Sequence, residues 1–248
     1  MIIYEINPPK IPVGINKEDK EIRQLLEKLE QRISEISPYC EGIHVTDSVL
    51  GTRRVSALIA GKIIKNKHPN LQITISMRVR DKSISEIRDT IRESISLDLD
   101  GILILKGDPA NEKSFDSGLV PSKVASDLRT EFSGETEFFL SLPSNPNFDK
   151  IQKKILAVPT GFMTQVIHSV NQVRRISNEL RPKGFRIIPC VLLPSEKNSR
   201  SAQFLNLDWS EYKNDPLEFI RNVHSIAGDV LVTSPNDFVY AKEVLRKI

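Results

Sequence analysis

The stretch GILIL at residues 101–105 is a short apolar run, and the polar triplet Lys-Gly-Asp follows it directly at 106–108. An uninterrupted apolar run of this length is typical of a strand with both faces buried, as in a parallel sheet. Further runs rich in β-branched residues have the same character. Together they predict eight strands, at residues 2–6, 42–46, 71–77, 101–105, 137–142, 161–166, 186–192 and 229–233.

Segments with the 3.6-residue period of an amphipathic helix separate these strands. Residues 22–36, 55–63 and 84–95 carry isoleucine and leucine on one helical face, and further helices are expected near 121–132, 147–157, 170–181, 197–206, 215–226 and 236–247. A repeated strand-then-helix order implies right-handed parallel crossovers. Eight such units in 248 residues match a (β/α)8, or TIM, barrel. We predict an α/β fold with one barrel domain over residues 1–248, the alternative being an open doubly wound sheet.

The composition excludes several classes of protein. Hydrophobic residues make up 39%, the net charge is +3, and no apolar run approaches the roughly 18 residues of a membrane span. The N-terminus has no signal-peptide pattern, so a cytoplasmic chain is expected, with neither a membrane nor a nucleic acid as partner. Two separate cysteines, Cys40 and Cys190, and four scattered histidines predict no metal site. Both common glycine-rich nucleotide loops are absent.

Glu5 is the most informative single position. It lies within the otherwise apolar run IIYEI at 2–6, near the end of the first predicted strand. The carboxyl ends of the strands form the active site in such barrels. Apolar surroundings disfavour the ionised form and raise the pKa of a carboxyl, which suits a general acid. An ion pair with a lysine or arginine inside the barrel explains the position equally well.

Two other strand ends carry candidate binding groups. In Lys106-Gly107-Asp108, a glycine between two charges lets the backbone approach a planar ligand closely, although a polar turn explains it too. Gln165 follows an apolar strand and offers both faces of its amide to a heterocycle edge, or else bonds a loop carbonyl.

Six segments, in order along nearly the whole chain, resemble the methylenetetrahydrofolate reductase family, whose catalytic domain is an FAD-binding (β/α)8 barrel. The start YEINPPK resembles that family's F-E-F-F-P-P-K, and ILILKGDP resembles its L-x-L-R/K-G-D-P. The six segments are YEINPPK at 4–10, VTDSVLGTRRVS at 45–56, ILILKGDP at 102–109, FMTQ at 162–165, IIPCVLLP at 187–194 and VTSPND at 232–237.

The resemblance implies a flavin-dependent oxidoreductase that reduces 5,10-methylenetetrahydrofolate, or a related C1-pterin, to the 5-methyl form in one-carbon and methionine metabolism. It implies FAD as cofactor, a folate-type C1 carrier as substrate and NAD(P)H or another electron donor. Glu5 would be the catalytic acid, Asp108 would lie beside flavin and pterin, and Gln165 would bond the pterin. The implied flavin contacts are Thr46, Ser76, Lys106, Gly107, Asp108, Asn145 and Lys154.

The chain departs from the family at several of these contacts. Ser76 stands where the family commonly has a histidine, and Asn145 lies in a loop that lacks the usual Y-P-E-x-H-P pattern. One alternative is therefore a pterin-binding barrel without flavin redox, either a methyl-transfer or a partner-dependent reductase subunit. Another is a non-enzymatic regulatory or scaffold protein. A homo-oligomer is compatible with each of them.

Overall fold

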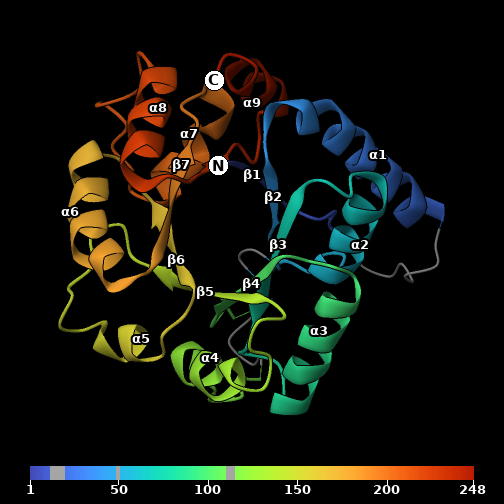
Figure 1. The fold of residues 1–248 in the computed structure, drawn as a ribbon. Coiled ribbons are helices and arrows are strands. Elements are labelled where there is room, and N and C mark those ends of the chain that lie inside the picture. Colours follow the sequence, from blue (N-terminus) through green and yellow to red (C-terminus); the bar gives the residue numbers. More distant parts are fainter. Residues whose placement is uncertain (12–19, 49–50, 110–114) are drawn as a thin grey trace.

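Eight parallel strands close into a barrel in the computed structural model, which describes residues 1–11, 20–48, 51–109 and 115–248 (Figure 1). The strands pair in chain order, and β8 returns to pair with β1. They are β1 (Ile2–Ile6), β2 (Gly42–Val45), β3 (Gln72–Arg78), β4 (Gly101–Leu105), β5 (Glu137–Leu142), β6 (Gly161–Val166), β7 (Arg186–Leu192) and β8 (Val230–Thr233). The predicted TIM-barrel fold is confirmed, and the open-sheet alternative is wrong.

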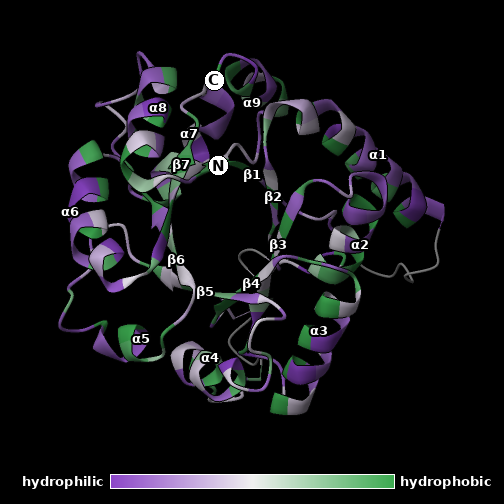
Figure 2. Ribbon diagram, in the orientation of Figure 1, coloured by the Kyte–Doolittle hydropathy of each residue, from purple (hydrophilic) through white to green (hydrophobic). Residues whose placement is uncertain are grey.

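Helices follow every strand and form the outer ring (Figure 1). They are α1 (Lys20–Ile36), α2 (Ala57–Lys67), α3 (Ile84–Ser96), α4 (Pro121–Arg129), α5 (Gln152–Leu156), α6 (Val170–Leu180), α7 (Ser199–Phe204), α8 (Pro216–Ala227) and α9 (Phe238–Leu245). Figure 2 shows hydrophobic and hydrophilic residues alternating along α3 and α6, as expected for helices with one buried face. Capping boxes start both helices, Ser83 with Glu86 in α3 and Ser169 with Gln172 in α6.

The apolar core is divided by the strands into an outer layer and a barrel interior. Residues such as Ile43 and Ile75 belong to the outer layer, with the buried faces of the helices. Because successive side chains of a strand point to opposite faces, the alternate residues point inward. The inward apolar residues form a separate, smaller cluster of Ile3, Leu103, Phe139, Met163, Ile188, Cys190 and Leu231.

Strands β6 and β7 approach each other unusually closely. A Cβ on Gly161 would lie 2.3 Å from the backbone oxygen of Arg186, so only glycine fits at the start of β6. The pairing then shifts register between Met163 and Val166. Such irregularities re-aim side chains at barrel rims. Here Met163, Thr164 and Gln165 all line one cavity, although a regular strand would turn the middle residue outward.

Ion pairs occupy the N-terminal end of the barrel. The Arg186 guanidinium contacts Asp229 at 3.0 Å and Glu137 at 2.8 Å, and it lies 5.6 Å from the centre of the Phe139 ring. The positive charge of Arg186 is thus balanced by two carboxylates at the edge of the apolar interior. This end of the barrel therefore serves stability, in keeping with its usual role in the fold.

Candidate active site at the C-terminal mouth of the barrel

A cavity of about 240 Å³ opens at the C-terminal ends of the strands, where barrel enzymes carry their active sites. Its lining combines polar and apolar side chains. Its lining comprises Glu5, His44, Thr46, Asp47, Ser48, Ser76, Arg78, Leu103, Leu105, Gly107, Asp108, Ser141, Met163, Thr164, Gln165, Cys190 and Leu231. We refer to it as the mouth cavity.

Glu5 lies on the cavity wall at the end of β1, in register with His44 of β2. Its carboxylate accepts a hydrogen bond of 2.6 Å from the Thr233 hydroxyl. Burial raises the pKa of Glu5 above its ordinary value of 4.5, and the Thr233 hydrogen bond offsets this only in part. Among the residues that the structure describes, no cation pairs with Glu5, so the ion-paired alternative is wrong for them.

His44 is the second titratable group of the wall, and its side chain is only 1% exposed. Its Nδ1 lies 2.8 Å from the Thr74 hydroxyl and its Nε2 lies 2.9 Å from the Ser76 hydroxyl. Burial lowers the pKa of His44 to about 4, so the ring is neutral at physiological pH. One nitrogen is then a donor and the other an acceptor, and both are satisfied.

Arg78 joins three rim loops. Its guanidinium donates to the carbonyls of Ser48 at 3.4 Å and Asp108 at 3.0 Å, and it contacts the Asp81 carboxylate at 3.6 Å. Gly107 packs over it with φ +83°, where a Cβ would lie 2.5 Å from the arginine Nε. Glycine is thus required at 107 both by the backbone conformation and by this contact. The pair fixes the position of the Lys106-Gly107-Asp108 loop.

The apolar part of the lining includes Leu103, Leu105, Met163 and Leu231. Cys190 also lines the cavity, and burial, with a contribution from Glu5, raises the pKa of its thiol. A thiol held protonated is a poor nucleophile. Cys190 is therefore a buried residue of low reactivity.

Most of the predicted site residues meet at the mouth cavity. Glu5, Thr46, Ser76, Gly107, Asp108 and Gln165 all line it. Lys106 is exposed beside it and pairs with Asp116 at 3.1 Å. Lys154 instead donates to the backbone carbonyl of Ser141, and burial lowers the pKa of its amine.

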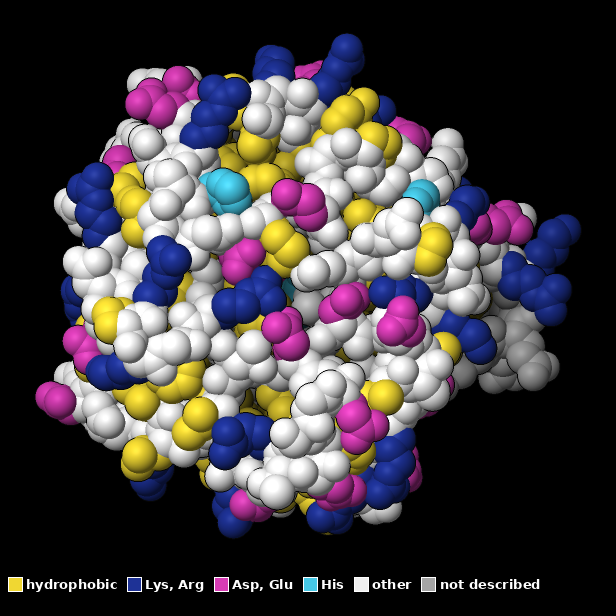
Figure 3. Space-filling view, in the orientation of Figure 1, with side chains coloured by type: hydrophobic (Ala, Val, Ile, Leu, Met, Phe, Trp, Pro, Cys, Tyr) yellow, Lys and Arg dark blue, Asp and Glu magenta, His cyan; other side chains and the backbone are white. Residues whose placement is uncertain are grey.

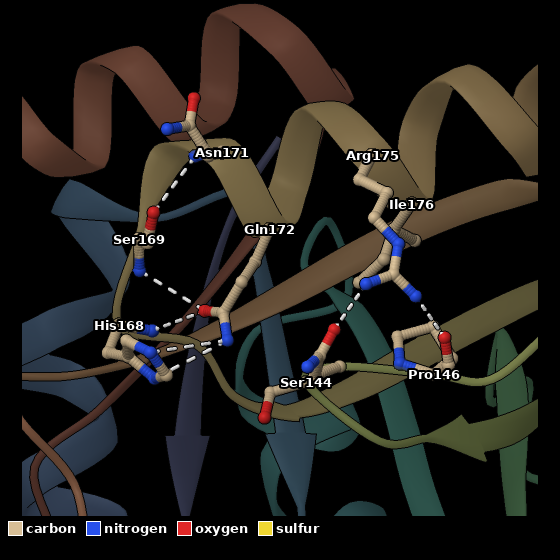
Figure 4. A pocket seen from close by; sticks show the side chains of 9 residues that line it. Ser144, Pro146, His168, Ser169, Asn171, Gln172, Arg175 and Ile176 are labelled. Carbon is tan, nitrogen blue, oxygen red and sulfur yellow. Dashed lines mark hydrogen bonds between the residues drawn. The ribbon is translucent and has the colours of Figure 1, made fainter.

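Asn145 lies in a different hollow, of about 310 Å³, outside the barrel at the start of α6. Figure 4 shows its lining, in which the Arg175 guanidinium bonds the Asn145 side chain and the Pro146 carbonyl. The Gln172 side chain accepts from the backbone N–H groups of His168 and Ser169. These polar groups are engaged with one another, which leaves the mouth cavity as the better candidate site.

Four of the predicted flavin contacts, Thr46, Ser76, Gly107 and Asp108, line the mouth cavity, but Asn145 and Lys154 do not, and several of the polar groups already bond other parts of the chain. Thr46 donates to Asn7 at 2.7 Å, Ser76 bonds His44, and Lys154 and Asn145 point to partners elsewhere. We therefore derive no chemistry through a flavin. No residue set in the described part of the chain offers three His, Cys, Asp or Glu groups for a metal ion, and none of its helices is long and apolar enough to cross a membrane.

Several residues of the cavity were missed by the sequence reasoning. His44, Asp47 and Arg78 line it, yet none was predicted as a site residue. Strand alternation could have found His44, because it lies two residues before Thr46 and so shares its face.

Figure 3 shows acidic and basic side chains intermixed over the face that it displays, without a large patch of one sign.

The fold and site thus define a (β/α)8 barrel with an acid-bearing cavity at its C-terminal mouth. No protein-family model and no curated protein sequence matches the chain. Among solved structures, the chain is similar to a crystal structure of 3-hexulose-6-phosphate synthase, with 10% identity and a TM-score of 0.58. The match covers 99% of this chain and 98% of that one.

The predicted flavin-dependent reduction of methylenetetrahydrofolate is wrong. The full-length structural match is to a synthase named for a hexulose phosphate, which points away from a flavin-dependent function. The associated assignments to flavoproteins, one-carbon metabolism and methionine biosynthesis are wrong with it, and the match counts equally against a pterin barrel without redox. The resemblance to the reductase family, and the predicted FAD, NAD(P)H, folate carrier and homo-oligomer, are tested by none of these findings and stay predictions.

Proposed function

We propose that this chain is an enzyme in which Glu5 transfers a proton to or from a small organic molecule bound in the mouth cavity. The observation that carries the proposal is a carboxyl with a raised pKa on the wall of an open cavity. A general acid or base works best when its pKa approaches the working pH, and burial without a cationic partner moves a glutamate in that direction.

The mixed lining suggests the kind of molecule. The leucine and methionine side chains accommodate apolar parts of a ligand, while Gln165, Ser76 and Ser141 offer it polar groups. The guanidinium of Arg78, an arginine of the lining, lies 3.6 Å from the Asp81 carboxylate, and the carboxyl groups of Asp47 and Asp108 line the same cavity. The cavity therefore favours an uncharged molecule with a polar edge over a strongly anionic one.

A sugar phosphate, the kind of compound named for the similar structure, fits this barrel less well. Phosphates in TIM barrels commonly bind at the loops after strands 7 and 8, at a helix N-terminus. Here the Asp237 carboxylate accepts from Tyr240 N–H at the start of α9. The buried Asn198 amide donates to the Leu193 carbonyl and the Ser234 hydroxyl and accepts from the Asn236 N–H. A phosphate would meet a carboxylate there and find these donors already engaged.

The experiment is a thermal-shift screen of uncharged and anionic metabolites, including a hexulose 6-phosphate, followed by turnover assays of every compound that binds. Loss of a positioned acid typically costs about 10²–10⁴ in rate, so Glu5→Gln should bind the substrate but turn it over slower by that factor. The matched control is Glu137→Gln at the opposite end of the barrel, which should leave turnover unchanged.

Equal turnover by wild type and Glu5→Gln would refute the proposal. So would tight binding of the hexulose phosphate with the phosphate at the β7 and β8 loops, because the substrate class would then be different.

A further inference from the structure

Three polar side chains form a hydrogen-bonded row in the apolar interior of the barrel, and we call this row the file. It runs from Ser76 through His44 to Thr74, with heavy-atom distances of 2.9 Å and 2.8 Å. All three residues are buried, at 5%, 1% and 7% exposure. The remaining side chains of this layer include Ile3, Leu103 and Phe139, which are hydrocarbon.

The file reaches a hollow at each end. Ser76 and His44 line the mouth cavity, the same cavity that Glu5 lines. Thr74 borders a second hollow of about 10 Å³ at the N-terminal end of the barrel, together with Gln72 and Arg186. A hollow of this size has room for about one water molecule, and Thr74, Gln72 and Arg186 are its polar lining beside Ile3, Phe139 and Ile188. The three hydrogen-bonded side chains therefore lie between the two hollows.

Every member of the file can both donate and accept a proton. Serine and threonine hydroxyls do so by rotation, and a neutral imidazole does so with its two nitrogens. His44 is neutral at physiological pH because burial lowers its pKa to about 4. Burying such polar groups costs free energy unless they are hydrogen-bonded. Hydrocarbon side chains would fill the same space without needing these hydrogen bonds.

We propose that Ser76, His44 and Thr74 relay protons through the barrel between solvent at the N-terminal hollow and the mouth cavity. In the inward transfer, Thr74 takes a proton from water in the hollow and gives its own to His44 Nδ1. His44 Nε2 gives its proton to Ser76, which releases its own into the mouth. One proton enters and one leaves, the ring changes tautomer, and the reverse transfer restores it.

The relay rests on the proposed function for its purpose, since it would exchange protons with the site while a bound molecule fills the mouth. Charged groups flank both ends. Glu5, Asp47 and Arg78 lie at the mouth, and Arg186 lies at the hollow, where Asp229 and Glu137 match its charge. In the mouth, Glu5, Asp47 and Asp108 carry carboxyl groups that can take up the proton, whereas the Arg78 guanidinium cannot accept one.

The test is the rate at which the His44 ring N–H exchanges with water, measured by NMR on full-length protein labelled with ¹⁵N-histidine, without substrate. Ser76→Val closes the route from the mouth and Thr74→Val closes the route from the hollow. The relay predicts that each single variant still exchanges through its open end. The double variant should slow by at least about 10²-fold, the usual effect of removing a positioned proton-transfer group.

Ser141→Val is the matched control, since Ser141 lines the mouth cavity but does not belong to the file. It should exchange at the wild-type rate, and melting curves should show that all the variants fold. The proposal is overturned if one single variant already slows to the level of the double variant, because the file then opens to one end only. It is also overturned if the wild-type ring fails to exchange. Neither outcome depends on turnover, so the relay and the role of Glu5 can fail separately.

Discussion

At the N-terminal end of the barrel Arg186 is held between two carboxylates, whereas at the C-terminal end Glu5 is held by the hydroxyl of Thr233. Both groups belong to barrel strands and lie close to the same apolar interior. The arginine keeps its charge because its counter-charges are 2.8 Å and 3.0 Å away. The glutamate retains its proton to higher pH because burial is offset only in part by the Thr233 hydrogen bond, and none of the described residues pairs a cation with it.

This difference separates stability from chemistry along one axis. A matched ion pair lowers the cost of burying charge but leaves no group free to change its protonation. A carboxyl without a counter-charge costs stability when it ionises, and for that reason it can give up or take a proton near neutral pH. The same barrel thus has two different ends. We call the N-terminal end, where Arg186 is paired with carboxylates, the closed end, and the C-terminal end, where Glu5 can change its protonation, the reactive end.

The largest expected effect concerns His44 and acid stability. Its pKa falls from 6.5 to about 4 on folding. A lowered histidine pKa stabilises the fold above the unfolded value of 6.5 and loses that contribution as pH falls through the folded value of about 4. The shift corresponds to roughly 3 kcal/mol. Denaturant titrations between pH 6.5 and 4 should show that the free energy of unfolding of wild type falls by this amount relative to that of His44→Gln. An equal pH dependence of the two free energies would contradict the prediction.

The ion pairs at the other end should give the next largest effect. Arg186→Met leaves Glu137 without its cation, while Asp229 still contacts the Met1 amine at 3.1 Å. Because the arginine side chain is 31% exposed, we expect a loss of about 2 kcal/mol, between the values for buried and surface pairs.

Arg92 provides a matched control. It also contacts two carboxylates, Asp89 and Glu131, and lies over an aromatic ring, but its side chain is 59% exposed. Arg92→Met should cost at most about 0.5 kcal/mol. Chemical denaturation of both variants measures the difference, and equal losses would show that the closed end of the barrel is no more than an ordinary surface.

A smaller difference between variant and control should come from Gly107 at the reactive end. Gly107→Ala must adopt φ +83° and place its Cβ against Arg78, whereas Gly134→Ala adopts a similar φ of +80° with nothing within 4 Å. The shared backbone penalty is about 1 kcal/mol. The contact with Arg78 should add about 1 kcal/mol more at position 107, as expected for overpacking. If denaturation curves give the two alanine variants the same stability, Arg78 does not hold the rim loop.

The sequence predicted the barrel well because strand and helix periods are local signals. The predicted bounds of β1, β4, β5, β6 and β7 agree with the structure, and β3 is displaced by one residue to Gln72–Arg78. Glu5 could be found because a charge inside an apolar run is visible in one dimension.

The rest of the site depends on which strands are neighbours and where loops turn. His44 meets Thr74 and Ser76 across 30 and 32 residues of chain. Asn145 was predicted beside the other contacts, but its loop turns outward to Arg175. The function inferred from the resemblance failed for a similar reason, since short segments at strand ends can match while their side chains find different partners.

The protonation of Glu5 is the property that tests the proposed site most directly. It can be measured across pH by infrared spectroscopy of the carboxylic acid C=O band, with Glu5→Gln as the reference. The account predicts a band that persists above the ordinary glutamate value of pH 4.5 and is absent in the variant. Since the folded pKa is raised, wild type should also be most stable relative to Glu5→Gln below pH 4.5 and lose that advantage as pH rises through the folded value. A Glu5 band that disappears at or below pH 4.5 would contradict the central claim that burial raises the pKa of an acid at the mouth of the barrel.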